Sequence, residues 1–179
     1  MHASLADILT DLAQNSVEAG ADRIDIGFHE SPEEVRISIK DNGKGMDEAT
    51  LARAMDPFWT DGEKHPGRRV GLGLPFLRQT AQACGGEADI ASVPGKGTTV
   101  DAVFPEHWDR PPAGNLVLLW LQCLTFDAEY GMGISRSRTD ADGSREVYEV
   151  ERAEVADALG GLEDAGALGL LREYLTSLE

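Results

Sequence analysis

Two side chains near the N-terminus, Asp11 and Asn15, have the types and spacing for chemistry on a metal-bound phosphate. Because they lie one helical turn apart, a helix would project both from the same face. The carboxamide oxygen of Asn15 is a suitable ligand for Mg²⁺, which prefers oxygen and keeps much of its shell for phosphate and water. The carboxylate of Asp11 could orient a water molecule or accept its proton. The alternative is a buried polar pair where a helix meets a sheet.

A glycine-rich segment, Asp41-Asn42-Gly43-Lys44-Gly45-Met46, follows an alternating stretch typical of a strand. Glycine tolerates positive φ and lets a ligand come close to the backbone, so Gly43 and Gly45 are suited to a binding loop. Asp-Asn-Gly is also a common turn signal. Taken alone, this segment therefore leaves a plain strand-to-helix turn open.

A third candidate group lies between residues 60 and 74. Lys64, Arg68 and Arg69 are cations in a Gly-rich, charged stretch of an acidic protein, so they are candidate phosphate contacts. Solvated surface positions are the alternative for each of them. The next residues, Gly71, Leu72, Gly73 and Leu74, open a predicted helix. Free backbone N–H groups at a helix N-terminus suit an anion such as phosphate.

Helical and alternating hydrophobic patterns predict the elements that hold these groups. The first half reads as an α+β fold with mainly antiparallel strands. The predicted helices cover residues 4–19, 48–55 and 74–84, and the predicted strands cover residues 23–28, 35–41, 87–92 and 98–104.

The segment from Pro105 through Pro112 interrupts the pattern, and we place a domain boundary there. The sequence thus predicts a first α+β domain over residues 1–106 and a small α/β appendage over residues 113–179. In the appendage, residues 115–126 are predicted as a strand, with residues 146–150 as its pairing partner and residues 131–133 as a turn. Residues 154–159 and 166–178 are predicted as helices.

Composition limits the classes of function. The chain has 179 residues and a net charge of -16, so its surface repels phosphate backbones and general nucleic-acid binding is not expected. The two cysteines, Cys84 and Cys123, match no metal or disulfide spacing and read as reduced core thiols. No signal peptide and no apolar run of membrane-spanning length is apparent, so we expect a cytoplasmic protein without a membrane partner.

Four motifs in order carry a family resemblance. They are Asp11 to Ala21, Asp41 to Met46, Gly71 to Leu74, and Gly95-Lys96-Gly97-Thr98. The set resembles the GHKL superfamily, which includes gyrase-type topoisomerases, chaperones of the heat-shock type, histidine kinases and MutL-type repair proteins. The resemblance implies the two-layer α/β sandwich of the GHKL (Bergerat) ATP-binding type. It also implies ATP or ADP as the ligand and Mg²⁺ as its cation.

The resemblance also implies roles for individual residues. Asp41 would accept a hydrogen bond from the exocyclic amine of adenine, and Thr98 would reach the base through water. Asn42, Gly43 and Gly45 would shape the pocket wall, and Met46 would pack on the base. Pro57-Phe58-Trp59-Thr60 is similar to a motif of histidine kinases.

Three functions remain open on this basis. The first is a kinase, either an orphan histidine kinase-like domain or an anti-sigma-type kinase, with its phosphoacceptor supplied by a partner protein. None of the histidines, at positions 2, 29, 65 and 107, has the usual phosphoacceptor setting. The second is a conformational switch that binds ATP without hydrolysing it. The third is a weak ATPase of the MutL or gyrase type, although Asp11 is one methylene shorter than the glutamate of that group.

The last predicted helix is rich in leucine, and it can pack on the ATP-binding domain or on a second copy of the chain. We therefore expect residues 113–179 to have a regulatory or docking role, with a homodimer through this segment as one arrangement.

Overall fold

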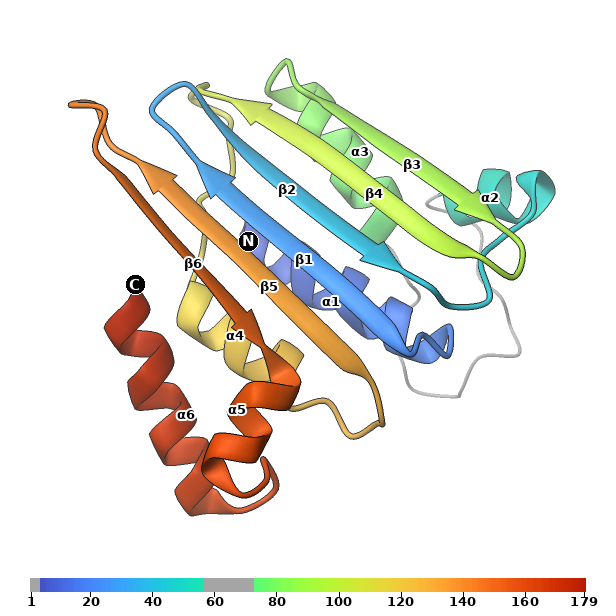
Figure 1. The fold of residues 1–179 in the computed structure, drawn as a ribbon. Coiled ribbons are helices and arrows are strands. Elements are labelled where there is room, and N and C mark those ends of the chain that lie inside the picture. The colour runs from blue at the N-terminus through green and yellow to red at the C-terminus, as the bar shows by residue number, and fades with distance from the viewer. Residues whose placement is uncertain (1–3, 57–72) are drawn as a thin grey trace.

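The computed structural model describes residues 4–56 and 73–179. Within these residues one mixed sheet has the strand order β3-β4-β2-β1-β5-β6 (Figure 1). The strands are β1 Arg23–Glu30, β2 Glu34–Asp41, β3 Glu87–Val93, β4 Gly97–Pro105, β5 Gly131–Thr139 and β6 Arg145–Glu151. The helices are α1 Leu5–Glu18, α2 Glu48–Ala54, α3 Gly73–Ala83, α4 Leu116–Leu124, α5 Arg152–Leu159 and α6 Ala165–Leu178. The predicted α+β, two-layer arrangement is confirmed.

Helix α1 begins where its sequence can satisfy the free N–H groups of a helix start. The Ser4 hydroxyl accepts a hydrogen bond from the Asp7 N–H, and the Asp7 carboxylate accepts one from the Ser4 N–H, which together form a capping box. The helix ends before Gly20, whose φ is +73°. Its apolar face is buried against the sheet and comprises Leu5, Ile8, Leu9 and Leu12.

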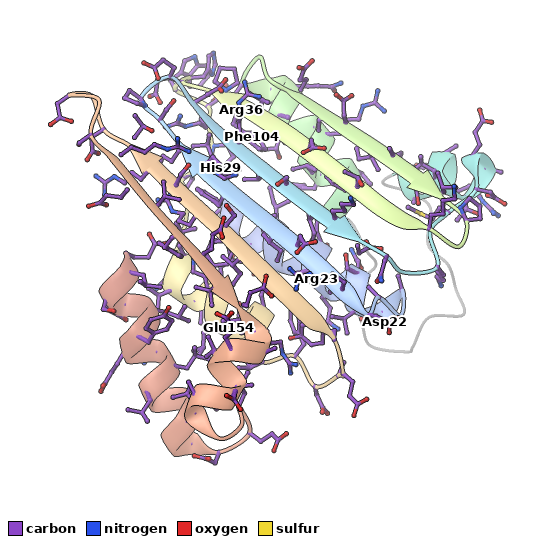
Figure 2. All side chains as sticks on the ribbon, viewed as in Figure 1. Asp22, Arg23, His29, Arg36, Phe104 and Glu154 are labelled. Carbon is purple, nitrogen blue, oxygen red and sulfur yellow. The ribbon has the colours of Figure 1, made fainter. Side chains whose placement is uncertain are left out.

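The sheet has one covered face and one open face. Ile24, Ile26 and Phe28 of β1 are almost fully buried, whereas Asp25 and His29, at the alternate positions, point to the other side. Helices α1, α3 and α4 lie behind the sheet in Figure 1, and no layer formed by residues 4–56 and 73–179 covers the face that is turned to the viewer. Figure 2 shows Arg23, His29 and Arg36 on that open face.

The prediction of a strand over residues 115–126 was wrong, because this segment forms α4. Its buried residues, Leu116, Leu119, Trp120, Cys123 and Leu124, follow helical spacing. The Asn115 side chain accepts a hydrogen bond from the Leu118 N–H, which caps the helix start. A short continuous apolar run reads equally well as a buried strand, so only the cap and the spacing distinguish the two.

The predicted turn at residues 131–133 and the predicted partner of residues 146–150 were also wrong. Gly131 begins β5, and β6 pairs with β5 rather than with residues 115–126. Strand β5 itself lies parallel to β1, with Ile134 opposite Ile26. The Arg- and Ser-rich sequence of β5 did not predict a strand, because two of its polar side chains, Arg136 and Ser137, are buried.

The sheet continues across the predicted boundary at residues 105–112. Strands β5 and β6 extend the sheet formed by the first four strands, and α4 packs against α1. A single cluster of buried apolar side chains includes residues from both parts. The division into two domains stays a prediction, but the two parts share one sheet and one core.

The structure also bears on the two cysteines and on membrane-spanning helices. Cys84 and Cys123 are buried and free, as predicted, and burial raises the pKa of the Cys123 thiol to about 12. No helix among residues 4–56 and 73–179 combines the length and the apolar character needed to cross a bilayer.

The shared core predicts that a cavity in α4 destabilises the whole protein. Leu119 is 1% exposed and Leu118 is 48% exposed on the same helix. We expect Leu119→Ala to lower the free energy of unfolding by about 2–5 kcal/mol in a single cooperative transition. The control Leu118→Ala should change it by no more than about 0.5 kcal/mol. Chemical denaturation followed by circular dichroism measures both, and a separate unchanged transition for residues 1–106 would contradict the shared core.

Candidate functional site

The site is centred on the carboxylate of Asp41, the last residue of β2. Its side chain lies at the covered face of the sheet, and the residue is only 9% exposed. One oxygen, Oδ1, accepts hydrogen bonds from the Gly43 N–H at 2.9 Å and the Thr98 N–H at 3.2 Å. The other, Oδ2, accepts one from the Ser16 hydroxyl at 2.9 Å. The three donors come from the following loop, β4 and α1.

These contacts leave Asp41 with capacity for one further donor. Each carboxylate oxygen has two lone-pair directions, and both directions of Oδ1 are used. Oδ2 is engaged by Ser16 alone within the described residues. A ligand N–H group that reaches Oδ2 would meet a buried acceptor already held in position, where such a bond is strongest.

The loop after Asp41 is tied to three neighbouring elements. The Asn42 side-chain oxygen accepts hydrogen bonds from the N–H groups of Asp22 and Arg23, both at 2.9 Å. The Lys44 N–H donates to the Ala19 carbonyl at 3.0 Å. The Gly95 N–H in turn donates to the Lys44 carbonyl at 2.7 Å. The loop therefore connects the end of α1, the start of β1 and the β3–β4 turn.

Two glycines permit the close approach of this loop to the β3–β4 turn. Gly45 has a φ of +60°, and a Cβ there would lie 2.0 Å from the Val93 carbonyl oxygen. Gly97 has a φ of +103°, and a Cβ there would lie 1.9 Å from the Asp41 carbonyl oxygen. Any side chain at either position would force the two segments apart.

A hydroxyl pair holds Met46 and Thr98 beside this contact. The Met46 N–H donates to the Ser92 Oγ at 2.8 Å, and the Ser92 Oγ lies 2.9 Å from the Thr98 Oγ1. Met46 is half-buried, as is Thr98. The two residues for which base contacts were predicted are thus fixed relative to each other by Ser92.

The second part of the site is the exposed side of α1. Asp11 is half-buried and accepts a hydrogen bond from the Gly73 N–H at the start of α3. A Cβ on Gly73 would lie 2.4 Å from the Asp11 Oδ2, so a larger residue there would displace this carboxylate. Desolvation by burial raises the pKa of Asp11, the Gly73 hydrogen bond lowers it by less, and the charge of Glu18 adds a further rise.

Asn15 lies one turn further along α1 and is half-buried. In the described part of the chain its side chain amide has no hydrogen-bond partner. No cluster of three or more His, Cys, Asp or Glu side chains that could hold a metal occurs in residues 4–56 and 73–179. A cation at Asn15 would therefore need further oxygen ligands from a bound molecule and from water, as Mg²⁺ usually has.

The structure brings most of the predicted site residues to one end of β2. Asp11 and Asn15 share α1 with Ser16, which contacts Asp41, while Gly73 contacts Asp11. Leu74 is partly buried against the core. Their ligand roles stay predictions. Lys64, Arg68, Arg69, Gly71 and Leu72 lie outside the described residues, as does the Pro57–Thr60 motif.

Sequence reasoning missed two residues of the site, Ser16 and Ser92, and one contact of Asn42. Ser16 was not predicted as a site residue, yet a hydroxyl at a core position of a helix signals a buried acceptor nearby. Asn42 was predicted to shape the pocket wall, which stays a prediction, and the structure adds that its side chain holds the turn between α1 and β1. Ser92 sits in an ordinary alternating strand, and no sequence signal identified it.

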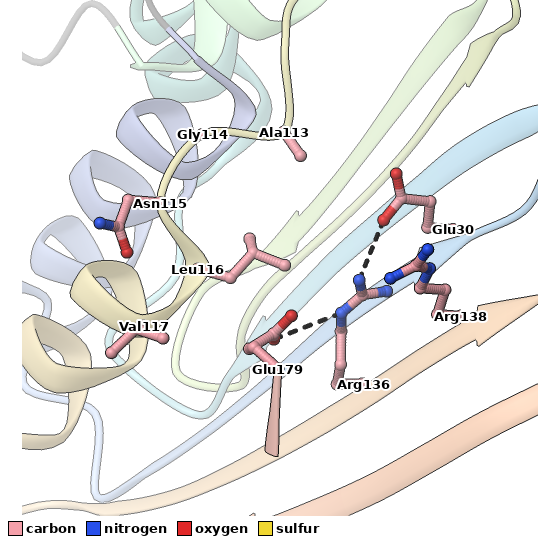
Figure 3. Close-up of a pocket in the computed structure, with 9 residues that line it drawn as sticks. All are labelled: Glu30, Ala113, Gly114, Asn115, Leu116, Val117, Arg136, Arg138 and Glu179. Atoms are coloured by element: carbon pink, nitrogen blue, oxygen red, sulfur yellow. Dashed lines mark hydrogen bonds and ion pairs between the residues drawn. The ribbon is translucent and has the colours of Figure 1, made fainter. Parts of the chain in front are cut away.

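A separate cavity of about 710 Å³ lies at the opposite end of β1, between the sheet and the N-terminus of α4. Figure 3 shows Arg136 inside it, paired with Glu30 at 2.9 Å and with Glu179 at 3.5 Å. Arg138 completes the charged lining, so two cations and two carboxylates balance. This balance does not favour a polyphosphate, and none of the predicted site residues lines the cavity.

Comparison with known proteins points to one family. Residues 2–107 match the family described as histidine kinase-, DNA gyrase B- and HSP90-like ATPase. A putative sensor protein of Shewanella frigidimarina is 38% identical over 103 residues, which cover 56% of this chain and 15% of that protein. The sensor histidine kinase WalK of Bacillus subtilis is 31% identical over 115 residues, covering 59% of this chain and 19% of that protein.

The sensor protein kinase FleS of Pseudomonas aeruginosa is 36% identical over 104 residues, covering 57% of this chain and 25% of that protein. The chain thus spans a quarter or less of the length of these three relatives. A crystal structure of the N-terminal domain of a DNA repair protein has a TM-score of 0.53 at 18% identity, covering 92% of this chain and 58% of that one. This likeness concerns the fold alone, and it extends into residues 113–179.

The glycine contacts give a prediction with a matched control. Gly95 also has a positive φ, of +73°, but nothing lies within 4 Å of a Cβ added there. We expect Gly95→Ala to cost about 1–2 kcal/mol of stability through backbone strain alone. Gly45→Ala should cost more and should weaken ligand binding, because the loop must move from β3. Thermal unfolding and nucleotide titration measure these effects, and equal losses in both variants would contradict the close-approach argument.

Proposed function

The chain belongs to the histidine kinase-, DNA gyrase B- and HSP90-like ATPase family, and from this premise we propose that it binds Mg-ATP and transfers phosphate to a partner protein. The buried Asp41 carboxylate carries the nucleotide part of the proposal. Among the described residues only Ser16 contacts its Oδ2, which leaves one acceptor direction for a ligand, and Gly43, Thr98 and Ser16 hold the carboxylate in place. The exocyclic amine of adenine is a donor of the required kind.

The metal part rests on Asn15. Its side-chain oxygen is a hard ligand, and Mg²⁺ bound there would draw its remaining ligands from ATP phosphates and water. The cation would supply charge neutralisation for the phosphates when it is bound. Asn15 lies on the same helix as Ser16, so α1 would position both the base-binding carboxylate and the metal ligand.

The phosphates would then lie toward the start of α3. Gly73 begins this helix, and its N–H group already faces the Asp11 carboxylate. Asp11 is therefore placed near the reacting end of the nucleotide in this proposal. Its raised pKa makes it a better proton acceptor than an exposed aspartate, which suits a role as a base toward a hydroxyl or a water molecule.

Transfer to a partner protein is the preferred outcome because the curated relatives are sensor proteins and kinases. The phosphoacceptor would come from another protein, and we place both in the cytoplasm. A second candidate is a switch that holds ATP unhydrolysed, which the short side chain of Asp11 favours. A third is a weak ATPase, which the half-buried position of Asp11 favours.

The adenine assignment predicts a loss of affinity in Asp41→Asn. The amide would present an N–H₂ group to donors that now face a carboxylate, at a cost of about 1.5–3 kcal/mol. We expect ATP to bind at least about tenfold more weakly, as measured by isothermal titration calorimetry. Asp101→Asn, with the same change of charge on the open face of the sheet, should bind ATP normally. Wild-type affinity in Asp41→Asn would refute the assignment.

The role of Asp11 predicts the fate of the γ-phosphate. With γ-labelled ATP and Mg²⁺ over hours, released or transferred label should disappear in Asp11→Asn while ATP affinity stays within about threefold. Because burial raises the pKa of Asp11, the rate should fall on acidification at a pH above the ordinary range of an aspartate. Full turnover in Asp11→Asn would exclude it as the base. Bound, intact ATP in the unaltered protein would favour the switch.

A further inference from the structure

One backbone junction connects the C-terminal segment to the nucleotide site. The N–H groups of Asp22 and Arg23 donate to the Asn42 side chain, and the Arg23 carbonyl accepts from the Asn42 N–H at 3.3 Å. The Asp22 carbonyl accepts from the N–H of Gly131, the first residue of β5, at 2.8 Å. Asp22 and Arg23 therefore hold the residue after Asp41 on one side and the start of β5 on the other. Figure 2 labels both residues at this end of the sheet.

The Arg23 side chain extends this junction to β6. Its Nη1 and Nη2 donate to the two carboxylate oxygens of Glu151 at 2.7 and 2.8 Å, which is a bidentate pair. The guanidinium reaches Glu151 across β5, over Gly133. A Cβ on Gly133 would lie 2.5 Å from the Arg23 Nη2, so glycine leaves the space that the arginine occupies.

Arg152, the residue after Glu151, contacts α4 and the segment that leads into β5. Arg152 donates to the Leu124 carbonyl at the end of α4 and to the Tyr130 carbonyl just before β5, at 2.9 and 3.0 Å. Its guanidinium also lies 4.3 Å from the centre of the Tyr130 ring. Helix α4 packs against α1, which carries Asp11, Asn15 and Ser16. Glu151 and Arg152 thus contact β1 and the end of α4, two elements that pack next to the residues of the nucleotide site.

The Glu151 carboxylate has no role in capping the helix that follows it. Glu151 occupies the residue before α5, but its side chain makes no capping hydrogen bond to that helix. Its recorded partner in the described residues is Arg23, and the Arg23 hydrogen bond lowers the pKa of Glu151. The pair is about 40% exposed on both sides, so its contribution to global stability is small. The Arg23–Glu151 pair matters here because it joins β1 to β6, and its contribution to stability is secondary.

From these contacts we infer that Arg23 and Glu151 are positioning residues of the nucleotide site, through which residues 113–179 set the place of the Asn42 loop beside Asp41. The inference rests on the proposed binding of ATP to Asp41. A change in the α5–α6 region would reach the base-binding loop through Glu151, Arg23 and Asn42 in turn. Nucleotide binding would, by reciprocity, change the strength with which the C-terminal segment is held.

The test compares two carboxylates that contact the same arginine. Asp25 also accepts a hydrogen bond from Arg23, at 2.8 Å. It lies on β1 opposite Gly133 of β5, but unlike Glu151 it belongs to the first part of the chain, so its loss leaves the Arg23–Glu151 pair in place. In the full chain, Glu151→Ala should weaken the binding of Mg²⁺ and a non-hydrolysable ATP analogue by about two- to fivefold. Asp25→Asn should leave it unchanged. Hydrogen exchange of the amides of residues 42–46 should speed up in Glu151→Ala alone.

A double-mutant cycle makes the result specific to the pair. Arg23→Ala in the Glu151→Ala background should cause little further loss of affinity, because the shared contact is already absent. Wild-type affinity and exchange in Glu151→Ala would overturn the inference while leaving ATP binding intact, as would an equal loss in Asp25→Asn. If the unaltered protein bound no nucleotide, the proposed function would fail and this inference with it. The melting temperature of each variant checks that it is folded.

Discussion

The site depends on one buried carboxylate whose hydrogen bonds come from three elements. Asp41 accepts from Ser16 on α1, from Gly43 in the following loop and from Thr98 on β4. Burying a charged group without such donors is strongly unfavourable, so these contacts are required for the site to exist at all. The same hydrogen bonds also hold α1 against the sheet next to the positions from which the Asp11 and Asn15 side chains project. The hydrogen bonds of this one carboxylate therefore align the loop after β2 with α1, the two elements for which base binding and phosphate contacts are proposed.

Several glycines lie at this end of the sheet because neighbouring elements come close together there. Gly45 and Gly97 allow the loop and the β3–β4 turn to touch through their backbones, and Gly73 allows α3 to begin against Asp11. Gly133 serves the C-terminal segment in the same way, since it leaves room for Arg23 to reach Glu151. Glycine here is a requirement of packing between elements, beyond the needs of any one turn.

The sequence predicted the elements up to residue 105 well because each carries a local signal. The Ser4–Asp7 capping box, the alternation in β1 and β2, and the glycines after Asp41 report their structure directly. It failed at α4, where an apolar run fits a helix or a strand, and at β5, where Arg136 and Ser137 are buried although their types suggest a loop. Ser92 could not be found, because its importance comes from Met46 and Thr98, which are distant in sequence or lie across a turn.

The most direct test is an experimental structure of the protein with Mg²⁺ and a non-hydrolysable ATP analogue. The account predicts the exocyclic amine of adenine within hydrogen-bond distance of the Asp41 carboxylate and the cation on the side-chain oxygen of Asn15. It also predicts the terminal phosphates near the start of α3, next to Gly73. A nucleotide bound elsewhere, for example in the cavity around Arg136, with Asp41 still contacting only protein groups, would contradict it.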